Sequence, residues 1–172
     1  MPGKKKSAEI ASLAPQRSNG KAAGIFPKMV DISEKEPIRR EATAEGTIYL
    51  RESTLRRIEA KEIEKGDPVQ IASIGAIQAV KSTPQWTMMC HPIPIEKTDV
   101  KVEVLTDCLK ITVSVVSFSK TGVEMEALNG VAAGLLNIWD VTKKYEKDEN
   151  GQYPSTRIGD IHVVEKVKGM KG

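Results

Sequence analysis

The chain has 172 residues, of which 40% are hydrophobic and 28% are charged, as in globular proteins with a hydrophobic core. This composition excludes disorder along the whole chain, and no apolar run is long enough to cross a bilayer. The N-terminus is basic but has no apolar stretch behind it, so we expect no secretory signal and a cytoplasmic protein. Cys90 and Cys108 have no zinc-like or redox spacing, and we expect neither a disulfide nor a metal site.

Basic residues are concentrated at the N-terminus. Residues 1–28 carry a net charge of +5, whereas the whole chain carries +3, so residues 29–172 carry about −2. Only 4% of the residues are aromatic, and an acidic body with few aromatic residues argues against nucleic acid as a partner. We predict a flexible basic tail at 1–28 and a single folded domain at 29–172.

Hydrophobic periodicity and turn residues predict the elements of the folded domain. In chain order we expect a strand at 41–50, a helix at 52–63, a second helix from 68 to about 81, a short helical turn and an extended loop within 82–95, strands around 100–104 and 111–115 joined by a hairpin at 106–108, a long helix from 121 to about 145, and a last strand at 159–166.

Two of these helices have recognisable start signals. Asp67 followed by Pro68 is an N-cap and a proline at the first helical position. Thr121 and Glu124 have the spacing of a capping box. The helix after Asp67 is apolar nearly all round, which predicts burial on more than one side, and its small residues would allow close approach of another backbone.

The order of elements predicts an α+β fold with the ferredoxin-like βαββαβ arrangement, in which the first helix is split in two. The helices would cover one face of an antiparallel sheet and leave the other face open in a single subunit. That open face and the apolar second helix together indicate an oligomer.

Several polar residues are candidates for chemistry, each with a structural alternative. Lys65 precedes a helix N-terminus, which attracts phosphate, although alone it could be a solvated loop lysine. Lys81 ends the same helix, where favourable interaction with the helix dipole is sufficient to explain it. His91, in a proline-constrained loop, is either a functional imidazole or a hydrogen-bonded structural one. Cys90 is expected to have a packing role, and Glu126, unlike Glu124, has no capping role to explain it.

Asp140 and Lys143 share one face near the end of the long helix, as a surface ion pair would. Glu126 and Asp140 are 14 residues apart, which is about 21 Å along a helix. They cannot both touch one small reacting group within one subunit. If both are functional, either the site is long or different subunits supply its two ends.

Seven segments in this order and spacing resemble the cyclic pyranopterin monophosphate synthases, the family also called molybdenum cofactor biosynthesis protein C. The segments are MVDIS (29–33), KGD (65–67), IASIGAIQAVKST (71–83), CHPIPI (90–95), KTGVEMEAL (120–128), WDVTK (139–143) and IGDIHVVEK (158–166). The resemblance implies ferredoxin-like subunits in a hexamer built as a trimer of dimers, with active sites at subunit interfaces and no cofactor. It implies that 3′,8-cyclo-7,8-dihydroguanosine 5′-triphosphate is converted to cyclic pyranopterin monophosphate and diphosphate.

The resemblance also assigns roles to residues. The family's catalytic aspartate and lysine fall on Asp140 and Lys143, and its KGD lysine falls on Lys65. Substrate contacts fall on Lys81, Met89, Cys90, His91, Met125 and Glu126. A buried Lys143 with a pKa lowered by nearby cations, packed against Asp140, would form a general acid–base pair.

Two other functions fit parts of the sequence. A ferredoxin-like sensor of small ligands would have the same fold but no need for Asp140 together with Lys143. An RNA-binding domain of similar topology is disfavoured by the scarce aromatic residues and the acidic body.

Overall fold

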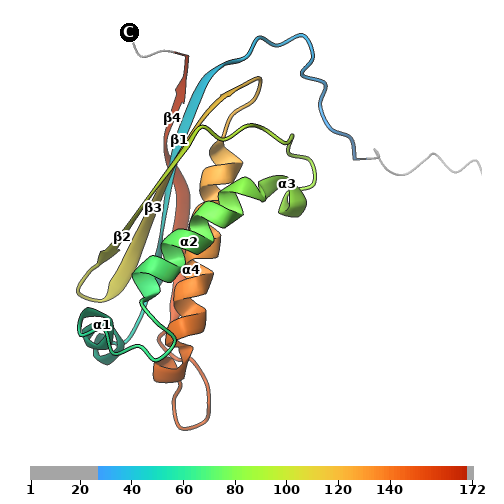
Figure 1. Ribbon diagram of the computed structural model, residues 1–172. Helices are drawn as coiled ribbons and strands as arrows, with labels where there is room; N and C mark the ends of the chain where they lie inside the picture. Colours follow the sequence, from blue (N-terminus) through green and yellow to red (C-terminus); the bar gives the residue numbers. More distant parts are fainter. Residues whose placement is uncertain (1–26, 170–172) are drawn as a thin grey trace, which may run out of the picture.

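The structure, a computed structural model, describes residues 27–169, which form a four-stranded antiparallel sheet and the helices packed on it (Figure 1). The elements are β1 (Ile38–Tyr49), α1 (Glu52–Glu59), α2 (Pro68–Lys81), α3 (Thr83–Trp86), β2 (Lys97–Val104), β3 (Cys108–Ser119), α4 (Glu124–Glu146) and β4 (Arg157–Lys168). The strand order is β2-β3-β1-β4. This confirms the predicted α+β fold, including the division of the first helical segment into α1 and α2.

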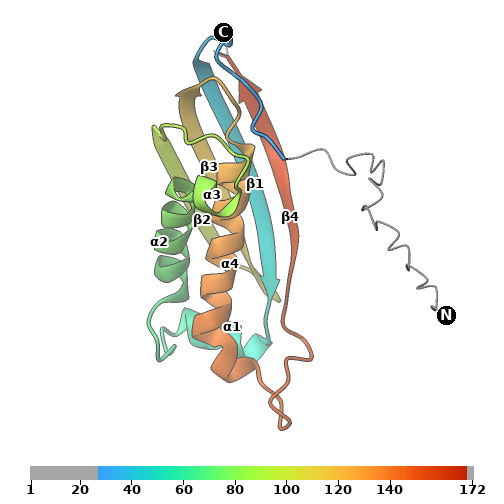
Figure 2. The ribbon, with the colours of Figure 1, turned by 90° about the vertical axis from the view of Figure 1, so that its right-hand side faces the viewer.

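The sheet has one apolar and one polar face. Alternate residues of β1 and β3 point toward the helices and are fully buried, among them Ile48, Ile111 and Val113. Figure 2 shows α2 and α4 together on this side, with α4 running along the length of the sheet. The opposite face carries polar pairs such as Thr43 with Ser114, whose hydroxyl oxygens are 2.8 Å apart. The period of two in the sequence therefore decides which face receives the helices.

Small residues let α2 and α4 approach closely, as expected from the sequence. Ala72 and Ala76 of α2 are completely buried. A β-carbon added to Gly134 of α4 would collide with the Ile111 side chain and lie 3.4 Å from the carbonyl oxygen of Ala72. The two helices are thus seated on β3 and on each other with no room for a larger side chain.

Two helix boundaries differ from the sequence prediction. The first helix ends at Glu59 instead of residue 63, because Lys61 adopts a positive φ of 59° that breaks the helix. The predicted capping box is wrong: α4 starts at Glu124 after Val123, and no side chain caps it. The Glu124 carboxylate instead pairs with Lys166 of β4, so a tertiary ion pair takes the place of the local motif.

Burial of α2 on more than one side, predicted from its composition, is wrong for the single chain. Ile74 is 70% exposed and Ile77 is 37% exposed. Beside them lies a groove of about 450 Å³ between α2 and α4, which Trp86 and Leu136 help to line. These two side chains are also well exposed, so the helical layer presents an apolar surface to its surroundings.

Three further expectations concern the chain as a whole. The predicted basic tail at 1–28 lies almost entirely outside the described residues. Both cysteines are free, with Cys108 buried and Cys90 half-buried. No helix between residues 27 and 169 is long and apolar enough to cross a membrane.

Candidate functional site

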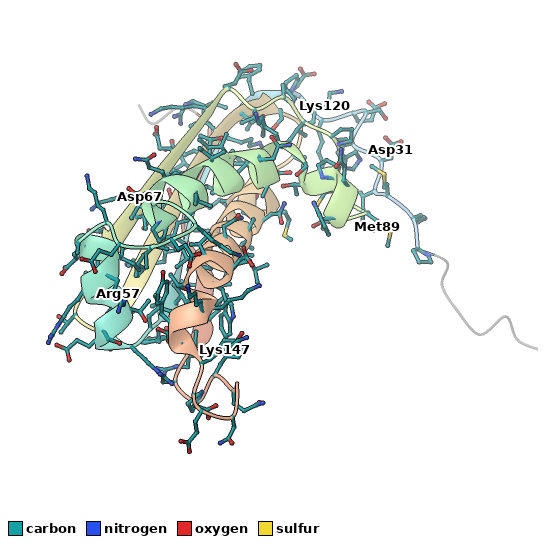
Figure 3. The ribbon with its side chains drawn as sticks, turned by 60° about the horizontal axis from the view of Figure 1, so that its bottom comes forward. Asp31, Arg57, Asp67, Met89, Lys120 and Lys147 are labelled. Carbon is teal, nitrogen blue, oxygen red and sulfur yellow. The ribbon has the colours of Figure 1, made fainter. Side chains whose placement is uncertain are left out.

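The predicted site residues fall into two groups at opposite ends of α4. The first, which we call the lysine–aspartate cluster, consists of Lys65, Asp140 and Lys143 and lies at the C-terminal end of the helix. The second, the histidine–glutamate cluster, consists of Met89, Cys90, His91, Met125 and Glu126 and lies at the N-terminal end. Figure 3 shows this separation: Met89, Asp31 and Lys120 lie at one end of the molecule, and Arg57 and Lys147 at the other.

The lysine–aspartate cluster is built around one carboxylate. Lys65 Nζ donates to Asp140 Oδ2 at 2.8 Å and to the backbone oxygen of Asp140 at 3.3 Å. Lys143 Nζ donates to Asp140 Oδ1 at 2.7 Å, one helical turn further along. Each carboxylate oxygen therefore has its own ammonium partner. All three side chains are roughly half exposed, so an incoming ligand can reach them.

These contacts set the protonation states of the cluster. The hydrogen bonds from Lys143 and then Lys65 lower the pKa of Asp140 to about 2. The hydrogen bond to Asp140 in turn raises the pKa of Lys143. The expectation that Lys143 is buried with a lowered pKa is therefore wrong for the single chain, because the nearest charge is a carboxylate and not another cation. The pair of Asp140 and Lys143 is thus held in its charged form, as carboxylate and ammonium.

A cavity of about 330 Å³ lies against this cluster and has a net positive lining. Its charged residues are four lysines and two acids: Lys65, Lys143, Lys144, Lys147, Glu64 and Asp140. Lys144 pairs with Glu64, while Lys65 and Lys143 share Asp140. Positive charge is thus left over, and it lies at the C-terminal end of α4, where the helix dipole favours cations.

The histidine–glutamate cluster surrounds a second cavity, of about 280 Å³, with a different character. Glu126 is only 3% exposed, and burial raises the pKa of its carboxyl group, with a smaller contribution from the charge of Glu124. Burial also raises the pKa of the Cys90 thiol, as does the nearby Glu126. A thiol held protonated is a poor nucleophile, which agrees with the packing role expected for Cys90.

His91 is half-buried and lines this second cavity together with Thr121 and Gly122. It also lines a third cavity, of about 420 Å³, that Pro37 and Phe118 help to form. Both the functional and the structural interpretation of His91 are compatible with this position. Lys81 is exposed at the end of α2 and lines neither cluster's cavity.

The sequence argument missed several residues of the lysine–aspartate cavity. Glu64, Lys144, Tyr145 and Lys147 line it, and none was singled out beforehand. Two of them, Glu64 and Lys144, directly precede or follow a candidate residue in the chain, which is the one signal that could have drawn attention to them. No group of three or more His, Cys, Asp or Glu that could hold a metal ion occurs within the described range 27–169.

The ferredoxin-like topology defines an α+β protein with two separate polar cavities, one rich in lysine and the other built on a buried carboxyl group. The chain belongs to the MoaC family, whose model matches residues 29–169. It is therefore related to the proteins that its sequence motifs resemble.

Three relatives match most of the chain. A probable cyclic pyranopterin monophosphate synthase of Sulfurisphaera tokodaii is 50% identical over 141 residues, which are 82% of this chain and 93% of that protein. The protein of the same name from Thermococcus kodakarensis is 50% identical over 142 residues, 83% of this chain and 91% of that protein. A third, from Archaeoglobus fulgidus, is 49% identical over 144 residues, 84% of this chain and 92% of that protein.

Proposed function

We propose that this protein is a cyclic pyranopterin monophosphate synthase of molybdenum cofactor biosynthesis, a lyase that converts 3′,8-cyclo-7,8-dihydroguanosine 5′-triphosphate to cyclic pyranopterin monophosphate and diphosphate. Membership of the MoaC family and the names of the relatives support the reaction. The observation that carries the assignment of residues is the sharing of Asp140 between Lys65 and Lys143 at the wall of a cationic cavity.

The lysine–aspartate cavity suits the triphosphate end of the substrate. A triphosphate brings several negative charges, and ammonium groups both bind it and stabilise the diphosphate as it leaves. Lys65 and Lys143 are the two cations that can change partner, since each is held by the same exposed carboxylate. A cavity of this kind explains why three lysines follow Asp140 within seven residues, at 143, 144 and 147.

Proton transfer in this site follows from the same contacts. Lys143 is protonated before the substrate arrives and is the natural donor. When phosphate oxygens take over the lysine contacts, Asp140 loses the hydrogen bonds that hold its pKa low. Its carboxylate then becomes a better base, as ring opening and pterin closure require. Binding of the anionic substrate would thus activate the aspartate that the lysines had kept inactive.

The histidine–glutamate cavity suits the heterocyclic end. It offers an imidazole and a buried carboxyl group and has no lysine in its lining. Hydrogen bonds from such groups fit the nitrogen and oxygen atoms of a guanine-derived ring. The fold keeps this cavity about 21 Å from Asp140 along α4, so one chain cannot form both halves of a compact pocket.

A second copy of the chain could bring the two kinds of cluster together despite this separation. Two copies related by a twofold axis with antiparallel α4 helices would each place one cluster opposite the other cluster of its neighbour. The exposed apolar residues between the two ends of α4, Leu136 and Trp86 among them, offer a surface for this contact. We infer a dimer of this type with two composite sites, and a hexamer built from three such dimers.

The direct test supplies purified full-length protein with the cyclised guanosine triphosphate and measures diphosphate together with an oxidisable pterin. We expect both to form in equal amounts in the absence of any added cofactor. Replacement of Lys143 by alanine should abolish the reaction with the protein still folded. Undiminished product formation by that variant would remove Lys143 from the mechanism, and absence of both products with the wild-type protein would overturn the proposed function.

A further inference from the structure

Lys65 is the one member of the lysine–aspartate cluster that is not on α4. It lies in the loop between α1 and α2, and its side chain is 52% exposed. The carboxylate that it contacts is 53% exposed. Exposed ion pairs contribute too little to hold a loop in one position. Buried Ile63 anchors the start of this loop in the core, and one further contact reaches the backbone beside Lys65.

That contact comes from Tyr145 in the last turn of α4. The backbone N–H of Glu64, the residue before Lys65, donates to the Tyr145 hydroxyl oxygen at 3.1 Å. The Tyr145 ring is itself covered by the guanidinium of Arg57, whose central carbon is 5.2 Å from the ring centroid. Since Tyr145 and Asp140 belong to the same helix, this hydrogen bond helps to set the distance between the Lys65 loop and the carboxylate.

We propose that Tyr145 is a positioning residue for the proposed reaction: its hydroxyl holds the Glu64 backbone so that Lys65 reaches Asp140 and the cationic cavity. The inference rests on the proposed function for its kinetic consequence, but its structural content is independent. A displacement of about 1 Å at a residue that orients substrate can cost a hundredfold in rate. One hydroxyl in the wall of the cavity can thus influence catalysis without touching the substrate.

Other contacts act on different parts of this region. Ile63 is buried at the start of the loop, and the Gly66 N–H donates to the Ile63 oxygen at 3.0 Å within it. The Lys144–Glu64 ion pair holds the same residue, but its side chains are 69% and 68% exposed. Glu146 accepts from the backbone N–H of Arg51 at 3.1 Å, which fixes the start of α1 and not the loop itself. Gly66, with a φ of 111°, allows the sharp turn after Lys65 but does not tie it to α4.

The decisive variant is Tyr145→Phe, which keeps the ring and its stacking with Arg57 and removes only the hydroxyl. We expect kcat/KM to fall about tenfold, as the loss of one such hydrogen bond implies. The loss should divide between kcat and KM in the same proportion as in Lys65→Ala. In a Lys65→Ala background, Tyr145→Phe should cause no further loss, because the two residues act as one unit.

A matched control exists in Tyr49, whose hydroxyl donates to Asp160 at 2.9 Å on the polar face of the sheet. Tyr49→Phe removes a comparable hydrogen bond away from both clusters and should leave kcat and KM unchanged. Full activity of Tyr145→Phe would overturn the proposal. So would a further tenfold loss in the Lys65→Ala background, which would mean that the hydroxyl touches the substrate directly.

Hydrogen exchange supplies a readout that does not depend on turnover. The Glu64 amide should exchange faster in Tyr145→Phe than in the wild type, with no change at the amides of α2 or β3. Unchanged exchange at Glu64 would overturn the positioning role even if activity fell. If the wild-type protein formed no product, the proposed function would fail, while the exchange comparison would still decide whether Tyr145 holds the loop.

Discussion

The two ends of α4 hold the same chemical group, a carboxylate, in opposite surroundings. Asp140 is half exposed, has two ammonium partners and has a pKa lowered to about 2. Glu126 is almost completely buried, and burial raises its pKa, with no cation among the described residues to lower it. One end keeps its charge at any physiological pH, whereas the other resists ionisation.

This difference indicates which end depends on a neighbour. In the lysine–aspartate cluster each carboxylate oxygen already has a partner within one chain, and in the proposed reaction a ligand would displace these contacts. The histidine–glutamate cluster contains a buried acid whose pKa no cation of residues 27–169 lowers, and burying such a group costs stability unless a cation or a donor pairs with it. The proposed composite site would supply that partner, because the positive cavity of a second copy would lie beside Glu126.

The largest effect on the reaction rate should follow from removing the negative charge of Asp140. Asp140→Asn keeps the shape but removes the charge that both lysines contact, and we expect a loss of about a thousandfold in single-turnover rate. Asp99→Asn is the matched control, because Asp99 is similarly exposed (61%) and pairs with Lys97 at 2.5 Å on β2. Near-normal rates in Asp140→Asn would show that the contrast between the two ends has no catalytic meaning.

Mixing two inactive variants tests whether the lysine–aspartate cluster of one chain and the histidine–glutamate cluster of another form one site. Lys143→Ala and Glu126→Ala should each be inactive alone. After joint unfolding and refolding in equal amounts, about a quarter of the sites would contain both intact halves if subunits pair at random in twofold dimers. Activity should then return to about a quarter of the wild-type value. Mass spectrometry confirms that mixed oligomers form. If these oligomers recovered no activity, the two clusters of different chains would not form one site.

Burial of Glu126 should change how the stability of the folded protein depends on pH. Because burial raises the pKa of Glu126, the folded protein keeps a proton at pH values where the unfolded chain, with an ordinary pKa near 4.5, has lost it. Stability therefore falls as pH rises between those two values. Glu126→Gln removes this penalty, so its melting temperature should exceed that of the wild type at pH 8 and match it near pH 4. A lower melting temperature at pH 8 would reveal a cation that holds the carboxylate charged in the assembly.

The smallest effect is expected from the exposed ion pairs of the lysine–aspartate cavity. Glu64→Gln removes the partner of Lys144, but both side chains are more than two-thirds exposed. We expect the melting temperature to change by no more than about 1–2 °C. Calorimetry at low and high salt checks this, and a larger, salt-sensitive drop would mean that the exposed end also stabilises the fold.

The sequence was informative wherever a local rule operates. Alternation of apolar residues located the strands, and Asp67 with Pro68 starts α2 as expected, with the Asp67 carboxylate accepting from the Val69 N–H at 2.9 Å. Thr121 and Glu124 have equally good local spacing, yet Glu124 pairs with Lys166, 42 positions away in the chain. A tertiary partner overrides a local motif, and one chain's periodicity contains no information on such a partner.

The candidate site shows the same limit. Spacing along a helix gave the separation of Glu126 from Asp140, since it depends only on the rise per residue. The contact between Lys65 and Asp140 joins residues 75 positions apart. The hydroxyl of Tyr145 accepts a hydrogen bond from the backbone N–H of Glu64, and no sequence motif predicts this contact. The sequence also could not predict whether the pKa of Lys143 is raised or lowered, because this depends on which charge lies nearest in space.

The continuity of α4 has a further consequence for how this protein can vary. Inserting one residue in the middle of the helix, near Gly134, would turn one end by about 100° relative to the other and lengthen the helix by about 1.5 Å. Both clusters would then face different directions, although each would be locally intact. We therefore expect changes in chain length to be tolerated in the 147–156 loop but not within the helix, whose number of residues fixes how the two clusters are placed relative to each other.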